Sequence, residues 1–167
     1  MRKVCFLTGA EGVGKSSVIP KLKEALSTVD VWDFDNLHRP FDFSEKWYEE
    51  VLDNCIKQIV ERDQVNRPLV VVGLIYPSSI IANLVKIGLS EYYFGLLDCS
   101  LEIRAERLRA RNADERLIAN IDNLETLRQQ MHDLSTPMFI LNTSHLNVYE
   151  VAELIISRIR KLFGFEE

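Results

Sequence analysis

The chain has 167 residues, of which 47% are hydrophobic and 27% are charged, a balance typical of one globular domain with a substantial core. Its formal net charge of -5 at pH 7 disfavours a nucleic-acid partner, because phosphate contacts need a basic surface. The three cysteines are far apart in the sequence and predict neither a disulfide framework nor a zinc site. No apolar run is long enough for a membrane span or a signal-peptide core, so we expect a cytoplasmic protein without a membrane partner.

Short apolar runs alternate with segments of helical periodicity along the chain. The apolar runs predict strands over 2–8, 29–34, 67–77, 92–99 and 137–144. Apolar residues at helical spacing predict helices over 15–26, 44–63, 78–87, 101–111, 121–134 and 148–163. Strands that alternate with helices form a parallel sheet that helices cover on both faces. We therefore predict an α/β fold: one three-layer α/β/α domain over residues 1–167 with five parallel strands.

Residues 9–16, GAEGVGKS, match the phosphate-binding pattern G-x-x-x-x-G-K-[ST] between a predicted strand and a predicted helix. Glycines let this P-loop curl so that its N–H groups point at one anion, and the helix adds its positive N-terminus. Lys15 would reach the β- and γ-phosphates as a catalytic cation, and Ser16 would place its hydroxyl on Mg²⁺. The predicted nucleotide-binding residues of this segment are Gly9, Glu11, Gly12, Val13, Gly14, Lys15, Ser16 and Ser17.

The rest of the chain narrows the class of phosphate chemistry. Neither the D-x-x-G nor the N-K-x-D pattern of GTPases occurs in the sequence. The most apolar predicted strand, 67–77, ends without the acidic residue that motor-type ATPases usually carry at this point. These absences favour a kinase, which transfers phosphate from ATP to a second substrate.

Two aspartates, Asp33 and Asp35, follow the second predicted strand in the stretch VDVWDFDNLH. They are two residues apart, so on an extended chain both side chains would face the same way. In a doubly wound sheet this strand end lies at the edge that binds ligands. One carboxylate could hold Mg²⁺ through water while the other accepts the proton of an acceptor hydroxyl. The alternative is a pair of solvated turn aspartates.

The P-loop, the D-x-D pair, an arginine-rich helix after the fourth strand and the final stretch LNTS together resemble the nucleoside-monophosphate-kinase-like group of small P-loop kinases. The stretch FDNLH, 34–38, is similar to a G-D-x-L-H segment of gluconate kinases, and DFD is similar to the D-x-D of shikimate kinases. The resemblance implies a strand order of 2-3-1-4-5. It also implies that Asp35 is the catalytic base that binds the acceptor and that Asp33 lies near the metal, whereas His38 is more typical of a cap or surface residue.

Arg104, Arg107 and Arg111 follow helical spacing in the stretch IRAERLRARN. They could form a solvated basic face paired with nearby glutamates, or they could meet the charge that develops in phosphoryl transfer. The resemblance implies the second role. Arg107 would stack on adenine, Arg111 would reach the phosphates as a catalytic residue, and a short lid over about 111–122 would exclude water. Arg116 in this lid is a further candidate.

The resemblance also assigns the two ends of the site. Asn142 and Thr143, in the stretch LNTSHLN, would border the adenine of ATP, although a plain helix cap explains them equally well. The acceptor-binding region would span about 35–90, with Arg39 and Tyr76 among its binding residues. Three positions depart from adenylate-type kinases, because residues other than arginine stand where arginines are usual: Ser78, Asn120 and Gln130.

These observations predict an ATP- and Mg²⁺-dependent phosphotransferase that moves the γ-phosphate to a hydroxyl of a small-molecule acceptor. The missing arginines favour a neutral acceptor over one that carries phosphate. Three alternatives stay open: a nucleoside or nucleotide kinase, a kinase for polynucleotide 5′-hydroxyls, and a regulator that binds ATP without transferring phosphate. The second would need a basic channel, which the acidic composition of the chain does not indicate. The sequence indicates neither the identity of the acceptor nor an oligomeric state.

Overall fold

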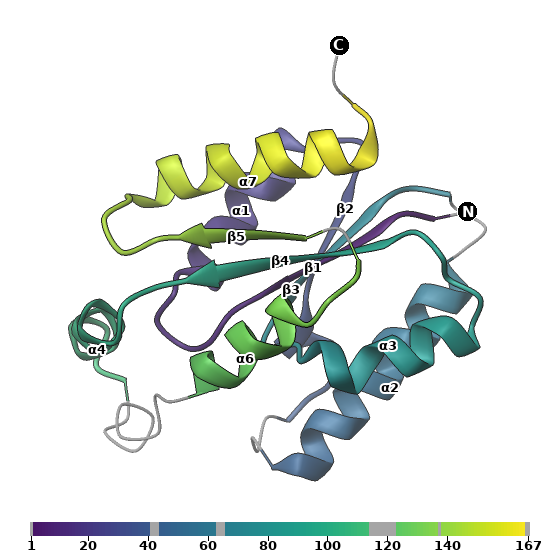
Figure 1. Cartoon of the computed structure of the whole chain (residues 1–167), viewed down its shortest axis with the longest axis horizontal. Coiled ribbons are helices and arrows are strands. Elements are labelled where there is room, and N and C mark those ends of the chain that lie inside the picture. The colour runs from purple at the N-terminus through teal and green to yellow at the C-terminus, as the bar shows by residue number, and fades with distance from the viewer. Residues whose placement is uncertain (1, 41–43, 63–65, 114–122, 137, 166–167) are drawn as a thin grey trace.

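In the computed structural model, the chain forms a five-stranded parallel sheet between two layers of helices (Figure 1). The structure describes residues 2–40, 44–62, 66–113, 123–136 and 138–165. The strands are β1 (Val4–Thr8), β2 (Asp30–Asp33), β3 (Leu69–Gly73), β4 (Tyr92–Asp98) and β5 (Met138–Asn142). Their order in the sheet is β2-β3-β1-β4-β5, which confirms the predicted α/β class and strand order.

Helices cover both faces of this sheet (Figure 1). On one face, α1 (Lys15–Ala25) packs against α7 (Val148–Phe163). On the other face lie α2 (Glu45–Glu61), α3 (Pro77–Lys86) and α6 (Asn123–His132). A short 3-10 helix, η1 (Phe34–Asn36), follows β2, and α4 (Leu101–Ala110) follows β4 at the carboxyl end of the sheet. This is the predicted three-layer arrangement.

The centre of the sheet is fully buried. Every residue of β1 and β3 is buried, as expected of strands that helices cover on both sides. Phe6 and Phe94 belong to the core shared with α2, α3 and α6, whereas Leu7 and Val72 belong to the core shared with α1 and α7. Burial of each such side chain stabilises the fold by about 1.5–3 kcal/mol. Because this core fixes the strand ends, it also positions the loops that follow them.

Local sequence signals set several element boundaries. Ser44 accepts a hydrogen bond from Trp47 N–H at 3.0 Å and so caps α2, as predicted. Pro77 occupies the first turn of α3, where its missing N–H costs least. Gly88 follows the end of α3 with a φ of 75°, in the left-handed region that glycine adopts readily.

The second strand is shorter than predicted. β2 ends at Asp33, and the next three residues form η1 rather than extended chain. The expectation that Asp33 and Asp35 face the same way on a strand is therefore wrong. The reason is local, because the Asp33 side chain accepts a hydrogen bond from Asp35 N–H at 3.2 Å and so caps the 3-10 turn.

None of the described helices is long and apolar enough to cross a bilayer. Cys5, Cys55 and Cys99 are free, buried thiols. Within the described part of the chain, no three His, Cys, Asp or Glu side chains group as a metal site would require.

Candidate phosphotransfer site

The P-loop lies between the end of β1 and the start of α1, at the carboxyl edge of the sheet. Gly12 has a φ of 80°, and a Cβ added there would lie 2.9 Å from the backbone oxygen of Arg104. Gly14 has a φ of 104° and directly precedes α1. Both positions need a left-handed backbone that residues with a side chain rarely adopt. The loop therefore curls over the N-terminus of α1, an arrangement suited to binding phosphate.

Lys15 is the first residue of α1, and its ammonium group folds back over the loop. Its Nζ donates hydrogen bonds to Gly9 O at 2.5 Å and to Ala10 O at 2.8 Å. Burial lowers the pKa of Lys15 from 10.5 to about 8, and the charges of Glu11 and Asp35 oppose this shift. Lys15 is therefore still mostly a cation at neutral pH, and phosphate oxygens would compete with the two carbonyls for it.

Two arginines of α4 contact the back of the loop. Arg104 is buried, and its Nε donates a hydrogen bond to Glu11 O at 2.8 Å. Arg107 donates to Thr143 O at 2.7 Å and to Thr143 Oγ1 at 3.2 Å. The buried Thr143 hydroxyl in turn donates to Val13 O at 2.9 Å. The loop backbone is thus tied both to α4 and to the residue that follows β5.

Asp35 lies in η1 and borders the same cavity as Lys15. Burial raises the pKa of the Asp35 carboxyl, Lys15 opposes this, and the charges of Asp33 and Glu11 add to it. Asp33 instead stays with its own loop, where it accepts hydrogen bonds from Asp35 N–H at 3.2 Å and from Asn36 Nδ2 at 2.6 Å. A carboxylate with a raised pKa takes up a proton more readily than an ordinary one. Of the two aspartates, Asp35 is the one that can meet a ligand in the cavity.

Aromatic side chains complete the cavity, which has a volume of about 280 Å³. Trp47 and Tyr48 from α2 and Phe34 from η1 line it. The centres of the Phe34 and Tyr48 rings are 5.9 Å apart, and Tyr48 meets Tyr76 edge-on at 6.0 Å. The Tyr48 hydroxyl also accepts a hydrogen bond from Tyr76 N–H at 3.0 Å, which fixes the ring. The remaining lining residues are Glu11, Gly12, Lys15, Ser16, Ser17, Asp35, Leu74 and Arg111.

The structure brings part of the predicted site together around this cavity. The predicted residues that line it are Glu11, Gly12, Lys15, Ser16, Ser17, Asp35 and Arg111. Other predicted residues are described but lie outside its lining: Gly9, Val13, Gly14, Asp33, Arg39, Tyr76, Arg107, Asn142 and Thr143. Arg39 is exposed on the loop after η1 and donates a hydrogen bond to the Asn36 side chain. Asn142 ends β5, and its Oδ1 accepts a hydrogen bond from Ser144 N–H at 2.9 Å.

The lid predicted over 111–122 lies largely outside the described residues, and with it Arg116 and Asn120. The other two departures from adenylate-type kinases meet in the structure. The Ser78 N–H at the start of α3 donates a hydrogen bond to Gln130 Oε1 of α6 at 3.1 Å. A neutral contact therefore joins α3 to α6 at positions where the resembled pattern has arginines.

The contacts of Asp98 are not predicted by the sequence pattern. This residue ends β4, and its carboxylate accepts a hydrogen bond from Cys99 N–H at 2.7 Å and forms an ion pair with Arg128 at 2.6 Å. Arg128 also pairs with Glu125, three residues earlier in α6, at 3.1 Å. The ion pair ties α6 to the carboxyl end of β4. The one available signal is the acidic residue that closes the apolar run YYFGLLD.

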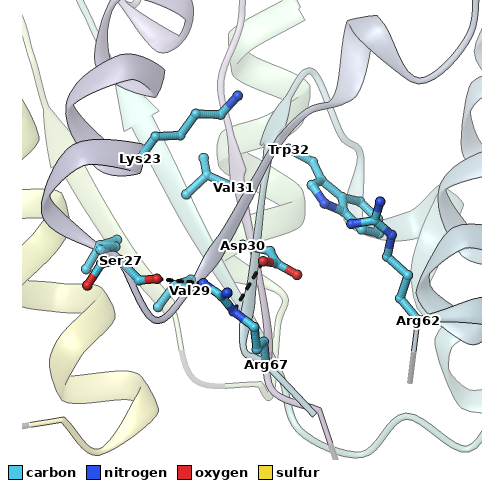
Figure 2. A pocket seen from close by; sticks show the side chains of 9 residues that line it. Lys23, Ser27, Val29, Asp30, Val31, Trp32, Arg62 and Arg67 are labelled. Carbon is cyan, nitrogen blue, oxygen red and sulfur yellow. Dashed lines mark hydrogen bonds and ion pairs between the residues drawn. The ribbon is translucent and has the colours of Figure 1, made fainter. Parts of the chain in front are cut away.

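A second cavity, of about 350 Å³, lies beside the amino-terminal end of β2, away from the P-loop (Figure 2). Arg67 donates a hydrogen bond to Ser27 O at 2.6 Å and pairs with Asp30 at 3.4 Å. Arg62 stacks on Trp32, with its guanidinium carbon 5.4 Å from the ring centre. β2 is an edge strand, and such side chains protect its backbone from pairing with another chain. These contacts explain the cavity as part of the sheet edge, and we assign no ligand to it.

Comparisons with known proteins agree with this geometry. No protein-family model matches the chain, and no curated protein matches it by sequence. Among solved structures, a gluconokinase from Sinorhizobium meliloti 1021 matches with a TM-score of 0.71 and 19% identity, over 99% of this chain and 98% of that chain. The YorR protein from Bacillus subtilis, in complex with phosphorylated GDP, matches with a TM-score of 0.66 and 17% identity over 99% of both chains. A shikimate kinase from Acinetobacter baumannii, in complex with shikimate, matches with a TM-score of 0.61 and 16% identity over 96% of both chains.

These likenesses confirm the resemblance to small P-loop kinases at the level of the fold. The chain has the nucleoside-monophosphate-kinase-like P-loop fold, with near-complete coverage in each comparison. The gluconokinase and the shikimate kinase are named for different substrates, and the YorR protein holds phosphorylated GDP. Identities below 20% do not transfer any of these molecules to this chain. Any activity of this chain has to be inferred from the side chains of the cavity.

Proposed function

We propose that the protein is an ATP- and Mg²⁺-dependent phosphotransferase that moves the γ-phosphate of ATP to a hydroxyl group of a small molecule. The observation that carries this proposal is that Lys15 of the P-loop and the carboxyl of Asp35 border one cavity of about 280 Å³. Asp35 is partly buried beside the phosphate site, where a carboxylate can accept a proton from a second substrate. The likeness of the fold to a gluconokinase and a shikimate kinase supports a hydroxyl acceptor. We place the reaction in the cytoplasm, since the three cysteines are buried free thiols.

The residues that border the cavity would have separate roles in this reaction. The P-loop N–H groups and Lys15 would hold the β- and γ-phosphates, and Arg111 would meet the charge that develops on the transferred group. Asp35 would accept the hydroxyl proton while the acceptor oxygen forms its bond to phosphorus. The bond between phosphorus and the β-γ bridging oxygen breaks, and ADP leaves with that electron pair.

The oxygen donors near the P-loop suit Mg²⁺, which prefers oxygen ligands and keeps several waters. The Ser16 hydroxyl borders the cavity and would hold the ion directly. Asp33 lies outside the lining and would contact the ion through water. When bound, Mg²⁺ would neutralise phosphate charge and orient the phosphate groups.

The adenine end of the site rests on the resemblance. The guanidinium of Arg107 is held by Thr143, and its planar face would stack on adenine. Asn142 would offer a hydrogen bond there, and Thr143 would act through the P-loop because its own side chain is buried. A lid over about 111–122 would close over the phosphates.

Asp35→Asn is the most direct test of the proposal. The amide keeps the shape of the side chain but cannot take up a proton, so we expect transfer to fall at least about 100-fold. ATP affinity should change by a factor of about three at most, which is under 1 kcal/mol. The reason is that Asp35 would contact the acceptor hydroxyl rather than ATP. Transfer is measured with radiolabelled ATP and a panel of hydroxyl compounds, and affinity is measured by calorimetric titration. Asp53→Asn, an exposed change on α2, is the control.

Two results would count against this assignment. If Asp35→Asn abolishes ATP binding, the carboxylate belongs to the metal site and the roles of Asp33 and Asp35 are exchanged. If the unchanged protein binds ATP but transfers phosphate to no compound of a broad panel, the protein is a nucleotide-binding regulator rather than a kinase.

A further inference from the structure

The cavity carries two carboxylates, and their charge bears on the nature of the acceptor. Glu11 of the P-loop and Asp35 of η1 both line it. Burial is the main cause of the pKa shifts of Lys15, Asp35 and Tyr76, and the charge of Glu11 is a further cause of each shift. The Glu11 carboxylate therefore acts on both the phosphate side and the acceptor side of the cavity.

The charged side chains that line the cavity do not neutralise the negative charge of MgATP. Within the described residues, the cations of the lining are Lys15 and Arg111, and the carboxylates of Glu11 and Asp35 oppose them. MgATP adds a net charge of about −2. Since Lys15 and the P-loop N–H groups serve the phosphates, a negatively charged acceptor would meet repulsion, which is stronger in a partly buried cavity than in water.

The arginines near the cavity have other partners. Arg104 and Arg107 contact the P-loop backbone, and Arg128 is paired with Asp98. The position in α6 where the resembled pattern has an arginine is Gln130, whose side chain accepts a backbone hydrogen bond from α3. In the part of the chain that the structure describes, the lining therefore offers no cation for an anionic group on the acceptor beyond those facing the phosphates.

Three of the uncharged lining residues are aromatic: Phe34, Trp47 and Tyr48. The face of an aromatic ring attracts a cation, and an ammonium group bound by rings and a carboxylate is well compensated. Glu11, Asp35 and these rings border one small volume. A molecule in this volume can present an ammonium group to Glu11 and a hydroxyl group to Asp35.

We propose that the acceptor is a hydroxyl compound that carries a protonated amine, of the amino alcohol or amino sugar class, and that Glu11 selects it. This inference rests on the proposed phosphotransfer function. The ammonium group pairs with Glu11 and stays protonated, so it is not the nucleophile. The hydroxyl oxygen bonds to the γ-phosphorus, its proton passes to Asp35, and ADP leaves with the electrons of the broken bond.

The test uses sets of compounds that differ in one charged group. The sets are glucosamine, glucose and gluconate, and serinol, glycerol and glycerate. Transfer from ATP gives kcat/KM for each compound, and calorimetric titration with Mg²⁺ and a non-hydrolysable ATP analogue gives its affinity. In at least one set we expect the amine to exceed the neutral compound about tenfold in both, and the carboxylate to be weakest.

Glu11→Gln removes the selecting charge and should lower the amine-to-neutral ratio about tenfold, which equals 1.4 kcal/mol. Glu24→Gln, an exposed change on α1, is the matched control and should leave the ratio unchanged. Equal or stronger use of the carboxylates, or an unchanged ratio in Glu11→Gln, overturns selection by Glu11 while the phosphotransfer function stands. Selective binding of the amines without transfer to any compound overturns the phosphotransfer function and supports selection by Glu11.

Discussion

The two halves of the cavity are built in different ways. The phosphate half is a backbone loop held from behind, where Arg104 and Thr143 each bind one of its carbonyl oxygens. The half that we propose binds the acceptor, called the acceptor half below, consists of side chains from η1 and α2, with Asp35 and Trp47 as examples. The phosphate half offers main-chain N–H groups on a loop that is held in place, whereas the acceptor half offers a carboxylate and aromatic rings.

The difference between the halves follows from what each would recognise. Phosphate is the same in every ATP molecule, so a curled backbone and one lysine are enough to bind it. An acceptor differs from one kinase to the next, and only side chains can encode that difference. Substitutions in the phosphate half should therefore alter the affinity for the nucleotide, whereas substitutions in the acceptor half should alter the choice of acceptor.

Lys15→Met should have the largest effect, since it removes the cation of the phosphate half. We expect weaker ATP binding and a fall in turnover of about 100- to 1,000-fold. The melting temperature should not fall, because burial already disfavours the charge of Lys15 and lowers its pKa to about 8. Transfer assays and thermal unfolding measure the two effects, with the exposed Lys23→Met on the same helix as control. Unchanged turnover would be incompatible with the P-loop assignment.

The phosphate half could be predicted because its signal is local. The spacing of Gly9, Gly14 and Lys15, between an apolar run and a helical period, predicts both the loop and its position at the sheet edge. The same alternation of runs predicts five parallel strands, and the helix predicted over 148–163 has the observed bounds of α7. Periodicity works here because each element buries a regular pattern of apolar residues.

The side-chain contacts around the two halves could be predicted only in part, because they depend on the three-dimensional arrangement. Period two placed Asp33 and Asp35 on one face of a strand, yet capping by Asp33 turns the chain into η1, and only Asp35 lines the cavity. Helical spacing grouped Arg107 with the other arginines of α4. Its contact with Thr143, 36 residues later, exists because the sheet places the end of β5 beside that of β4. Such long-range pairs leave no periodic trace in one sequence.

Arg107→Met tests whether the phosphate half depends on its support. The change removes hydrogen bonds to Thr143 O and Thr143 Oγ1, so we expect a loss of about 1–3 kcal/mol in the free energy of unfolding without nucleotide. The KM for ATP should rise about tenfold, equivalent to 1.4 kcal/mol, while acceptor selectivity is unchanged. Urea unfolding and steady-state kinetics measure these, with the exposed Arg109→Met as control. A raised KM with unaltered stability would mean that Arg107 acts on ATP by direct contact alone.

The two halves should also titrate in opposite directions. Lys15 loses its charge as the pH rises through about 8, so kcat/KM for ATP should fall about tenfold per pH unit well above that value. Partial burial raises the pKa of Asp35. The carboxylate loses its ability to accept a proton as the pH falls through that pKa, which lowers transfer on the acid side. Lys15→Arg keeps a charge at high pH and should abolish the alkaline fall. An alkaline fall that persists in Lys15→Arg belongs to another group.

The ion pair between Asp98 and Arg128 should have the smallest effect, because it holds α6 to β4 outside the cavity lining. Asp98→Asn keeps an acceptor for Cys99 N–H, so a double-mutant cycle with Arg128→Gln isolates the charge. The side chains are 19% and 35% exposed, and we expect a coupling energy of about 0.5–1 kcal/mol in urea unfolding. Turnover should stay within about twofold, which is under 0.5 kcal/mol in the barrier. A tenfold loss of transfer with an unchanged KM for ATP would instead mean that α6 helps to form the acceptor half, although its ion pair with β4 lies outside the cavity lining.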